Sequence, residues 1–263
     1  MIAQLPMYWR RENAAAHTAL WGLIRDGLRA RAIDAPDRLD TSVPYDHAWR
    51  RPDLVLSQVC NLPLRSALKG KVTLIGASDY GLAQCPAGYY RSYFVVRDDH
   101  RATRPTQLDG ARMAYNDEGS HSGWGAPMLW ALNCGVTFNP ILHTGAHAAS
   151  AAAVLSGEVD FACIDAQTWR DLRLYLPQTR RLRIIGVTDV SPGQTFCTAY
   201  GADPAPYFAA ISEAIAHLPR MHKATLGLKG IVRLRPQAYD LPLPQEPHVA
   251  ANLFATHWPS DAG

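Results

Sequence analysis

The feature that most constrains the fold is a repeated unit in which a short apolar strand ends in a polar turn and a helix follows at once. Residues 111–132, ARMAYNDEGSHSGWGAPMLWAL, show it most clearly, because the apolar run ends at Asn116 and a helix opens near Ser120. Strands that alternate with helices in this way predict an α/β fold. We therefore expect parallel sheets with helices on both faces.

Hydrophobic spacing places the expected elements. Residues 13–31 form the strongest helix, because Leu20, Ile24 and Leu28 recur on one face. Strands are expected at 2–6, 53–58, 72–77, 89–96, 111–116, 138–144, 159–164, 182–187 and 195–198. Further helices are expected at 64–68, 106–108, 122–133, 147–155, 167–175, 207–217, 222–227 and 248–257.

Polar side chains follow most of these strands. Ligands bind at the carboxyl ends of strands in open α/β sheets, where the helices begin. The strand ends therefore predict a polar cleft that includes Tyr8, Gln58, Tyr80, His147 and Asp165. Loop residues are polar in general, so each of these residues could also be an ordinary loop residue that contacts no ligand. Asp165 also suits the N-cap of the helix that follows.

The helix start at Ser120, His121, Ser122 and Gly123 is the best candidate for an anion site. The first N–H groups of a helix have no partner inside the helix and lie at the positive end of its dipole. Two hydroxyls add donors, and a glycine leaves room for an anion. Ser120 or Ser122 also suits a plain N-cap, so both interpretations remain open at this point.

Composition excludes several classes of protein. The net charge is +3, with 26 Lys and Arg against 23 Asp and Glu, and no basic run predicts a nucleic-acid partner. The five cysteines include no CxxC pair, so we expect no metal site and leave one disulfide open. No apolar stretch reaches the roughly 18 residues of a membrane span. No leader is recognisable, so the chain is either cytoplasmic or numbered without an exported leader.

Enzyme motifs are also absent. The sequence holds no GxSxG, P-loop or GxGxxG, and we expect no cofactor. The run GSHSG at 119–123 approaches a nucleophile elbow, but its register puts His121 where the nucleophile belongs. Two alternatives to a binding protein stay open. They are an enzyme on the same scaffold that acts on a small phosphorylated or heterocyclic metabolite, and a cytoplasmic sensor.

Five segments carry a resemblance to a known family. They are LPMY (5–8), DLVLSQVCNLPLR (53–65), GYYRSYFVVRDD (88–99), AYNDEGSHSGW (114–124) and TGAHAASAAAVLSGEVDFACIDAQTW (144–169). In this order and spacing the chain resembles the substrate-binding proteins of phosphate, phosphite and phosphonate ABC transporters, within the type II periplasmic binding proteins. The resemblance implies two α/β lobes joined by two crossing strands, near 89–96 and 182–187. Lobe 1 then comprises residues 1–86 plus 189–263, and lobe 2 comprises 87–188.

The resemblance also implies roles for the cleft residues. It places Tyr8, the pair Ser120 and Ser122, and His147 around the anion oxygens. Tyr80 is a second aromatic residue of the cleft, and Asp165 is its acidic residue, which meets a ligand amine in aminophosphonate binders. Hydroxyls, imidazole and backbone N–H groups are all donors, which suits a ligand that offers only acceptors. The chain departs from the family at His121, where a small hydroxyl residue is usual.

These observations lead to one functional expectation. The chain is a solute-binding protein that captures a small anion, a phosphonate, phosphate or phosphite, in a cleft between two lobes, and it performs no chemistry. An ABC transporter permease is the expected partner, and the periplasm the expected location if a leader is missing from the numbered chain. We expect Tyr8 and His147 to face the anion from opposite lobes, with Asp165 on the far side of the cleft.

Overall fold

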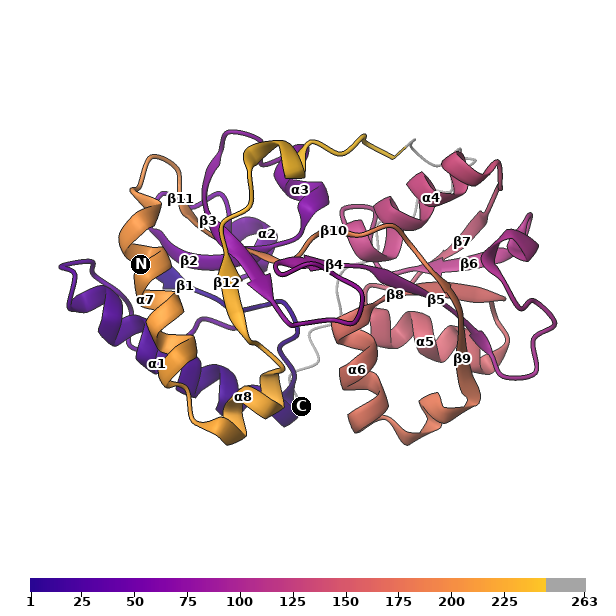
Figure 1. Ribbon diagram of the computed structural model, residues 1–263, viewed down its shortest axis with the longest axis horizontal. Helices are drawn as coiled ribbons and strands as arrows, with labels where there is room; N and C mark the ends of the chain where they lie inside the picture. Colours follow the sequence, from indigo (N-terminus) through magenta and orange to yellow (C-terminus); the bar gives the residue numbers. More distant parts are fainter. Residues whose placement is uncertain (245–263) are drawn as a thin grey trace.

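The computed structural model describes residues 1–244 and has two α/β lobes that lie side by side (Figure 1). Each lobe is built on a five-stranded sheet. The sheet of lobe 1 has the order β1 (Ile2–Ala3), β2 (Leu54–Val59), β11 (Thr195–Ala199), β3 (Val72–Asp79) and β12 (Gly230–Val232). The sheet of lobe 2 has the order β7 (Asn139–His143), β6 (Arg112–Tyr115), β8 (Phe161–Asp165), β5 (Ser92–Arg97) and β9 (Leu182–Val187).

The helices cover these sheets within their own lobes (Figure 1). Lobe 1 carries α1 (Ala14–Arg29), α2 (Tyr45–Ala48), α3 (Asn61–Arg65), α7 (Pro204–His217) and α8 (Arg220–Leu226). Lobe 2 carries α4 (Ala126–Cys134), α5 (His147–Ser156) and α6 (Ala166–Tyr175), and a π-helical turn (His121–Gly125) precedes α4. Single 3₁₀ turns lie at Arg11–Asn13, Pro105–Leu108, Pro177–Arg181 and Pro236–Tyr239. None of the described helices is long and apolar enough to cross a membrane.

The apolar positions of the sequence form a separate core in each lobe. Leu20, Ile24 and Leu28 of α1 are buried against the first sheet and α7, as their helical spacing predicts. In lobe 2, Phe94 and Phe161 are fully buried in the corresponding core. Burying about 25 cal/mol per Å² of apolar surface is the main stabilising term for such cores. Each lobe therefore has an apolar interior of its own behind the cleft.

The prediction of parallel sheets is wrong in part, because both sheets are mixed. β1 and β2 are parallel, as are β6 with β7 and β6 with β8. β11 runs antiparallel to β2 and β3, and β5 runs antiparallel to β8 and β9. β5 and β11 are the strands that follow the crossings between lobes, so each enters its sheet against the direction of its neighbours. The sequence analysis also missed β12, which is short.

Two crossings connect the lobes, and they differ slightly from the expected positions. β4 (Tyr89–Tyr90) and β10 (Ser191–Pro192) form a two-stranded antiparallel pair between the two sheets (Figure 1). The first crossing therefore lies at the start of the predicted segment. The second follows β9, which itself pairs with β5 inside lobe 2. The exact lobe boundaries at 86/87 and 188/189 stay predictions, and the helix expected at 248–257 lies outside the described residues.

Candidate functional site

A cavity of about 360 Å³ lies between the two lobes. Lobe 2 lines it with the turn after β6, the start of α5 and the end of β8, which are the strand ends that the sequence analysis singled out. Lobe 1 lines it with the loop after β1, with α2 and with the segment around α3. Five of the predicted site residues contribute to the lining: Tyr8, Ser120, Ser122, His147 and Asp165.

Ser120, Ser122, His147 and Asp165 all belong to lobe 2, and we call them the anion wall. Ser122 Oγ lies 2.8 Å from Nε2 of His147, which is the first residue of α5. Ser120 Oγ lies 3.4 Å from Ser122 Oγ. Ser92 Oγ donates to the Ser122 carbonyl at 2.9 Å and so fixes the turn on β5. Two hydroxyls and one imidazole are thereby held together at a single point of the cavity.

The predicted regular helix start at 122–133 is replaced by the π-helical turn. The N–H groups of Trp124 and Gly125 both donate to the Ser120 carbonyl, at 3.2 and 3.0 Å. Pro127 has no N–H for the Gly123 carbonyl, and its ring would clash there in a regular α-helix. In the structure α4 begins only at Ala126, so Pro127 lies in its first turn, where a missing N–H is tolerated. The π turn fills the space before it, and π turns are frequent at functional sites.

Gly123 serves this turn in a way that the sequence did not predict. Its N–H donates to Ser120 Oγ at 3.2 Å, so Ser120 is an N-cap after all and the Gly123 N–H is already occupied. A side chain on Gly123 would collide with the Asn116 side-chain oxygen. That oxygen is buried and has no hydrogen-bond partner among the described residues. Gly123 therefore lies outside the cavity lining and makes room for Asn116, which lies within it.

Asp165 has two roles, one for each carboxylate oxygen. Oδ1 accepts from the N–H groups of Gln167 and Thr168, at 2.7 and 2.9 Å, and so caps α6. Oδ2 accepts from the Tyr8 hydroxyl at 2.8 Å, across the cleft. Asp165 thus caps α6 and also lines the cleft, while its contact with a ligand stays a prediction. Burial raises the pKa of Asp165 to about 6, against hydrogen bonds that lower it.

Tyr8 reaches the anion wall from lobe 1 through a strained backbone. Its φ is 67°, in the left-handed region that a bulky residue rarely occupies. Asn13 holds this loop, because its Nδ2 donates to the Tyr8 carbonyl and its Oδ1 accepts from the Arg10 N–H, both at 2.8 Å. Tyr8 and His147 thus come from opposite lobes, as expected. Asp165, expected on the far side of the cleft, contacts Tyr8 directly instead.

The electrostatics of the anion wall suit a ligand that accepts hydrogen bonds. Burial lowers the pKa of His147 to about 4, so the ring is neutral at pH 7. Burial also raises the pKa of Tyr8, and the Asp165 carboxylate raises it further. The wall therefore presents hydroxyl and imidazole donors without a permanent positive charge. A dianion in contact with it makes charge-assisted hydrogen bonds while favouring the neutral form of Asp165.

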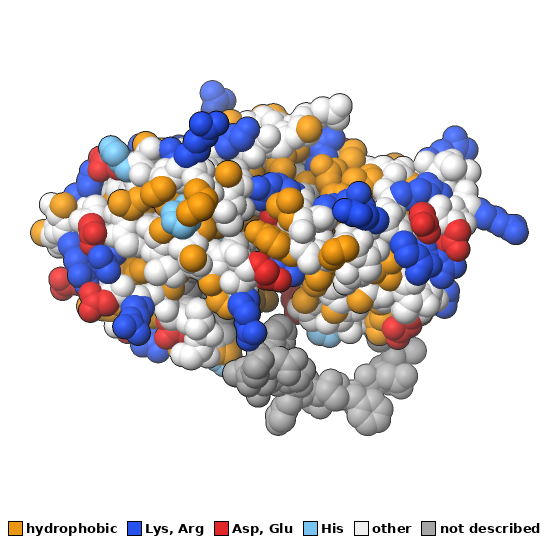
Figure 2. Space-filling model, turned by 90° about the horizontal axis from the view of Figure 1, so that it is seen from below, with side chains coloured by type: hydrophobic (Ala, Val, Ile, Leu, Met, Phe, Trp, Pro, Cys, Tyr) orange, Lys and Arg blue, Asp and Glu red, His pale blue; other side chains and the backbone are white. Residues whose placement is uncertain are grey.

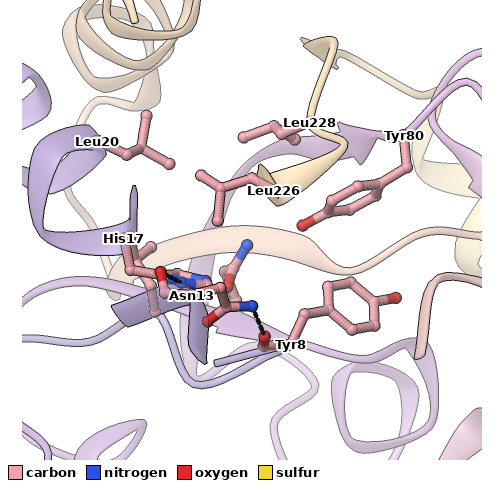
Figure 3. A pocket seen from close by; sticks show the side chains of 9 residues that line it. Tyr8, Asn13, His17, Leu20, Tyr80, Leu226 and Leu228 are labelled. Carbon is pink, nitrogen blue, oxygen red and sulfur yellow. Dashed lines mark hydrogen bonds between the residues drawn. The ribbon is translucent and has the colours of Figure 1, made fainter. Parts of the chain in front are cut away.

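Gln58 and Tyr80 line a different, smaller pocket behind Tyr8 (Figure 3). Its volume is about 10 Å³, enough for about one water molecule. The Tyr8 and Tyr80 rings meet edge to face with centroids 5.0 Å apart. Asn13 and His17 close the other side of this pocket, where Nδ1 of His17 lies 3.2 Å from the Asn13 carbonyl. Gln58 and Tyr80 therefore lie beside Tyr8, outside the lining of the larger cavity.

His121 also lies outside both pockets, although it was a predicted site residue. Its ring is buried, with Nδ1 3.3 Å from a guanidinium nitrogen of Arg65 on α3. Burial and the positive charge of Arg65 lower the pKa of His121 to about 3. Since Arg65 can only donate, Nδ1 accepts this hydrogen bond. His121 thus joins the two lobes beside the cavity.

The sequence analysis missed most of the lobe 1 side of the cavity. Its apolar part comprises Met7, Trp49, Pro63, Ala67 and Leu68, which we call the apolar wall. These side chains are apolar, so the search for polar residues at the ends of strands did not mark them. Gln194 was missed as well; it lines the cavity, and its buried Oε1 has no hydrogen-bond partner among the described residues.

Other predicted features concern metals, disulfides and charge. All five cysteines are free, so the disulfide left open above is not present. Within residues 1–244, no group of His, Cys, Asp and Glu is arranged to hold a metal ion. Lys and Arg side chains are interspersed with Asp and Glu on the face in Figure 2, without a uniformly basic surface.

The sequence matches the family of periplasmic substrate-binding proteins of phosphonate ABC transporters over residues 66–239, more than half of the chain. The chain belongs to this family. Its role is therefore that of a solute-binding protein, and neither the enzyme nor the cytoplasmic-sensor alternative is favoured. None of the curated proteins matches the chain.

Solved structures with the same fold support the two-lobed assignment. XAC2383 from Xanthomonas citri, bound to ATP, is 19% identical with a TM-score of 0.67, and the match covers 90% of this chain and 92% of that one. PhnD1 from Prochlorococcus marinus, in complex with methylphosphonate, is 17% identical with a TM-score of 0.68, over 91% and 94%. A binding protein of a phosphonate ABC transporter from Pseudomonas aeruginosa is 14% identical with a TM-score of 0.66, over 91% and 82%. The expected type II periplasmic-binding-protein fold of this phosphonate-binding family member is confirmed.

Proposed function

We propose that this phosphonate-binding family member captures a phosphonate, phosphate or phosphite with the anion wall and delivers it, in the periplasm, to an ABC transporter permease. Ser120, Ser122 and His147 donate to the oxyanion, and Tyr8 closes over it from lobe 1. Gln58 and Tyr80 support Tyr8 from behind. The observation that carries the proposal is the contact of Ser122 with His147, which places a hydroxyl and an imidazole nitrogen of a buried wall side by side at one point of the cavity.

The ligands of two fold neighbours fit this chemistry. The neighbour from Xanthomonas citri is bound to ATP, and the neighbour from Prochlorococcus marinus is in complex with methylphosphonate. Both ligands present a phosphorus oxyanion. A neutral cage of donors suits such a group, because each charge-assisted hydrogen bond contributes about 1.5–3 kcal/mol.

The protein performs no chemistry in this proposal, although Ser122 and His147 resemble a nucleophile and its base. A general base works best with a pKa near the working pH, and burial holds that of His147 at about 4. A catalytic histidine is also oriented by a third group. The Cys163 backbone favours the charged form of His147, and none of the described carboxylates is paired with the ring.

Titration calorimetry of methylphosphonate against Ser122→Ala tests the proposal. The variant removes one hydrogen bond to a charged group, so binding should weaken by about 1.5–3 kcal/mol, or roughly 10- to 150-fold. Ser156→Ala is the matched control, because Ser156 bonds only to the Ala153 carbonyl within α5. Unchanged affinity in Ser122→Ala, or an equal loss in both variants, would contradict the proposal.

A further inference from the structure

The cavity extends well beyond the anion wall, and part of its lobe 1 side is apolar. Trp49 and Leu68 are buried members of one hydrophobic cluster, and Met7 packs against that cluster. Pro63 and Ala67 continue the same surface along the cavity. The apolar wall is therefore anchored in the interior of lobe 1 and does not depend on a ligand for its position.

Two polar side chains beside the apolar wall already have partners, whereas the exposed guanidinium of Arg50 lies at the cavity edge. Nε1 of Trp49 donates to Ser57 Oγ at 3.2 Å and to the Gln58 carbonyl at 3.1 Å. Ser66 Oγ donates to the Leu62 carbonyl at 2.7 Å. By contrast, oxygens of Asn116 and Gln194 are buried without partners among the described residues. The apolar wall thus offers a ligand dispersion contacts and little hydrogen bonding.

The size of the cavity also exceeds what a bare oxyanion needs. Sites for organic ligands span about 300–1,000 Å³ and combine apolar walls with a few placed polar groups. The cavity of about 360 Å³ has both parts in one continuous space. An inorganic phosphate at the anion wall would leave the apolar wall in contact with solvent. The geometry fits a ligand with an anionic head and an apolar remainder.

We propose that the preferred ligand is a phosphonate or phosphate monoester whose organic substituent is an alkyl chain of several carbons or an aromatic ring. The head lies on Ser122 and His147, and the substituent packs on Trp49 and Leu68. This inference rests on the proposed function and adds the class of substituent to it. Apolar burial then contributes to affinity in addition to the hydrogen bonds of the head.

Calorimetry with methyl-, butyl-, hexyl- and phenylphosphonate tests the inference on the unmodified protein. Each buried methylene should raise affinity roughly fourfold until the cavity is filled. Affinity that stays level or falls from methyl to hexyl would overturn the inference and leave the proposed function standing. A protein that binds none of the four compounds and neither phosphate nor phosphite would contradict the proposed function itself, so the two failures are distinguishable.

Ala67→Phe sharpens the test, because Ala67 is exposed and borders the cavity, and a ring there fills space that the substituent needs. The ratio of hexylphosphonate to methylphosphonate affinity should fall at least tenfold. Ala30→Phe is the matched control, at an exposed alanine that caps the C-terminal end of α1 and lines neither of the two pockets described above. A ratio that stays the same in Ala67→Phe, or falls equally in Ala30→Phe, would overturn the assignment of the apolar wall.

Discussion

The two walls of the cleft differ in how much unfavourable ionisation and backbone strain each carries in the absence of a ligand. The anion wall holds a carboxyl group with a raised pKa and an imidazole with a lowered one, and it faces Tyr8, whose backbone is strained. In the apolar wall, the indole N–H of Trp49 donates two hydrogen bonds, and the side chains pack in or against a hydrophobic cluster. The anion wall therefore lowers the stability of the fold, whereas the apolar wall is part of the stable core of lobe 1.

This difference supports the proposal that the anion wall recognises the head group. Unfavourable ionisation and unusual backbone conformations persist where function requires them, and they are compensated elsewhere in the fold. The apolar wall needs no such compensation, because packing a substituent on it only removes apolar surface from water. Three predictions test this account of the cleft, in order from the largest expected effect to the smallest.

The largest effect is expected on stability, from Asp165→Asn. The folded-state pKa of about 6 exceeds the ordinary 3.8, so unfolding releases a proton between these values. The stability penalty of ionised Asp165 is thus complete above pH 6 and is relieved as the pH falls through 6. Asp165→Asn removes it and keeps a side-chain oxygen for the cap of α6. We expect the variant to be more stable by up to about 3 kcal/mol at pH 8.

Urea unfolding at pH 8 and at pH 4 measures this effect. The gain in stability should nearly disappear at pH 4, where the folded wild type carries a protonated Asp165. Asp189→Asn is the control, since it makes the same charge change at an exposed position. A destabilised Asp165→Asn at pH 8 would mean that the carboxylate stabilises the cleft, contrary to the comparison of the walls.

The next effect concerns the pH dependence of binding. An anion favours protonated Asp165, so affinity for a phosphonate without an amine should fall as the pH rises through 6, by up to about tenfold per unit. An amine-bearing ligand such as 2-aminoethylphosphonate favours the ionised form of Asp165. The ionisation of Asp165 should therefore raise the affinity for this ligand as the pH rises through 6. The ligands also ionise in this pH range, but this affects both proteins equally. The ratio of wild-type affinity to Asp165→Asn affinity at each pH therefore reports on Asp165 alone. Parallel curves for the two proteins would place Asp165 outside the ligand site.

The smallest effect is expected where the lobes touch away from both walls. Arg170 of α6 donates to the carbonyls of Ala224 and Thr225 on α8, at 2.5 and 3.2 Å, and Gln167 donates to that of Leu226 at 3.1 Å. These bonds stabilise the closed arrangement independently of the ligand. Because Arg170 is partly exposed, Arg170→Met should cost about 1 kcal/mol of closure, or roughly fivefold in affinity.

Small-angle scattering measures the same change directly. Without ligand, Arg170→Met should have a larger radius of gyration than wild type, and saturating ligand should bring both to the same value. Arg173→Met is the matched control, because Arg173 lies on the same helix but bonds to the Thr179 carbonyl within lobe 2. Identical curves for the free forms of Arg170→Met and wild type would show that these contacts do not hold the lobes together.

The sequence predicted the parts of the site that local patterns determine. Ser120, Ser122, His147 and Asp165 each lie at or soon after the end of a strand, so the rule for open α/β sheets included them. The same rule also included Gln58 and Tyr80, which lie outside the larger cavity, and the family resemblance was needed to assign roles. His121 was placed differently because the π-helical turn replaces the helix start, and Pro127, a few residues later, was the available signal. Trp49 and Gln194 reach the cavity only through contacts between distant segments, which no spacing reveals. β5 and β11 run antiparallel to their neighbours because each follows a crossing between the lobes, and the local periodicity of the sequence does not reveal this direction.

A crystal structure with methylphosphonate is the most direct test of the central claim that the two walls divide the ligand between them. We predict that phosphonate oxygens lie about 2.7–3.0 Å from Ser122 Oγ and His147 Nε2, with the methyl group directed toward Trp49 and Leu68. A phosphonate held instead by the exposed guanidinium of Arg50 at the cavity edge, or one whose methyl group points at the anion wall, would contradict the account.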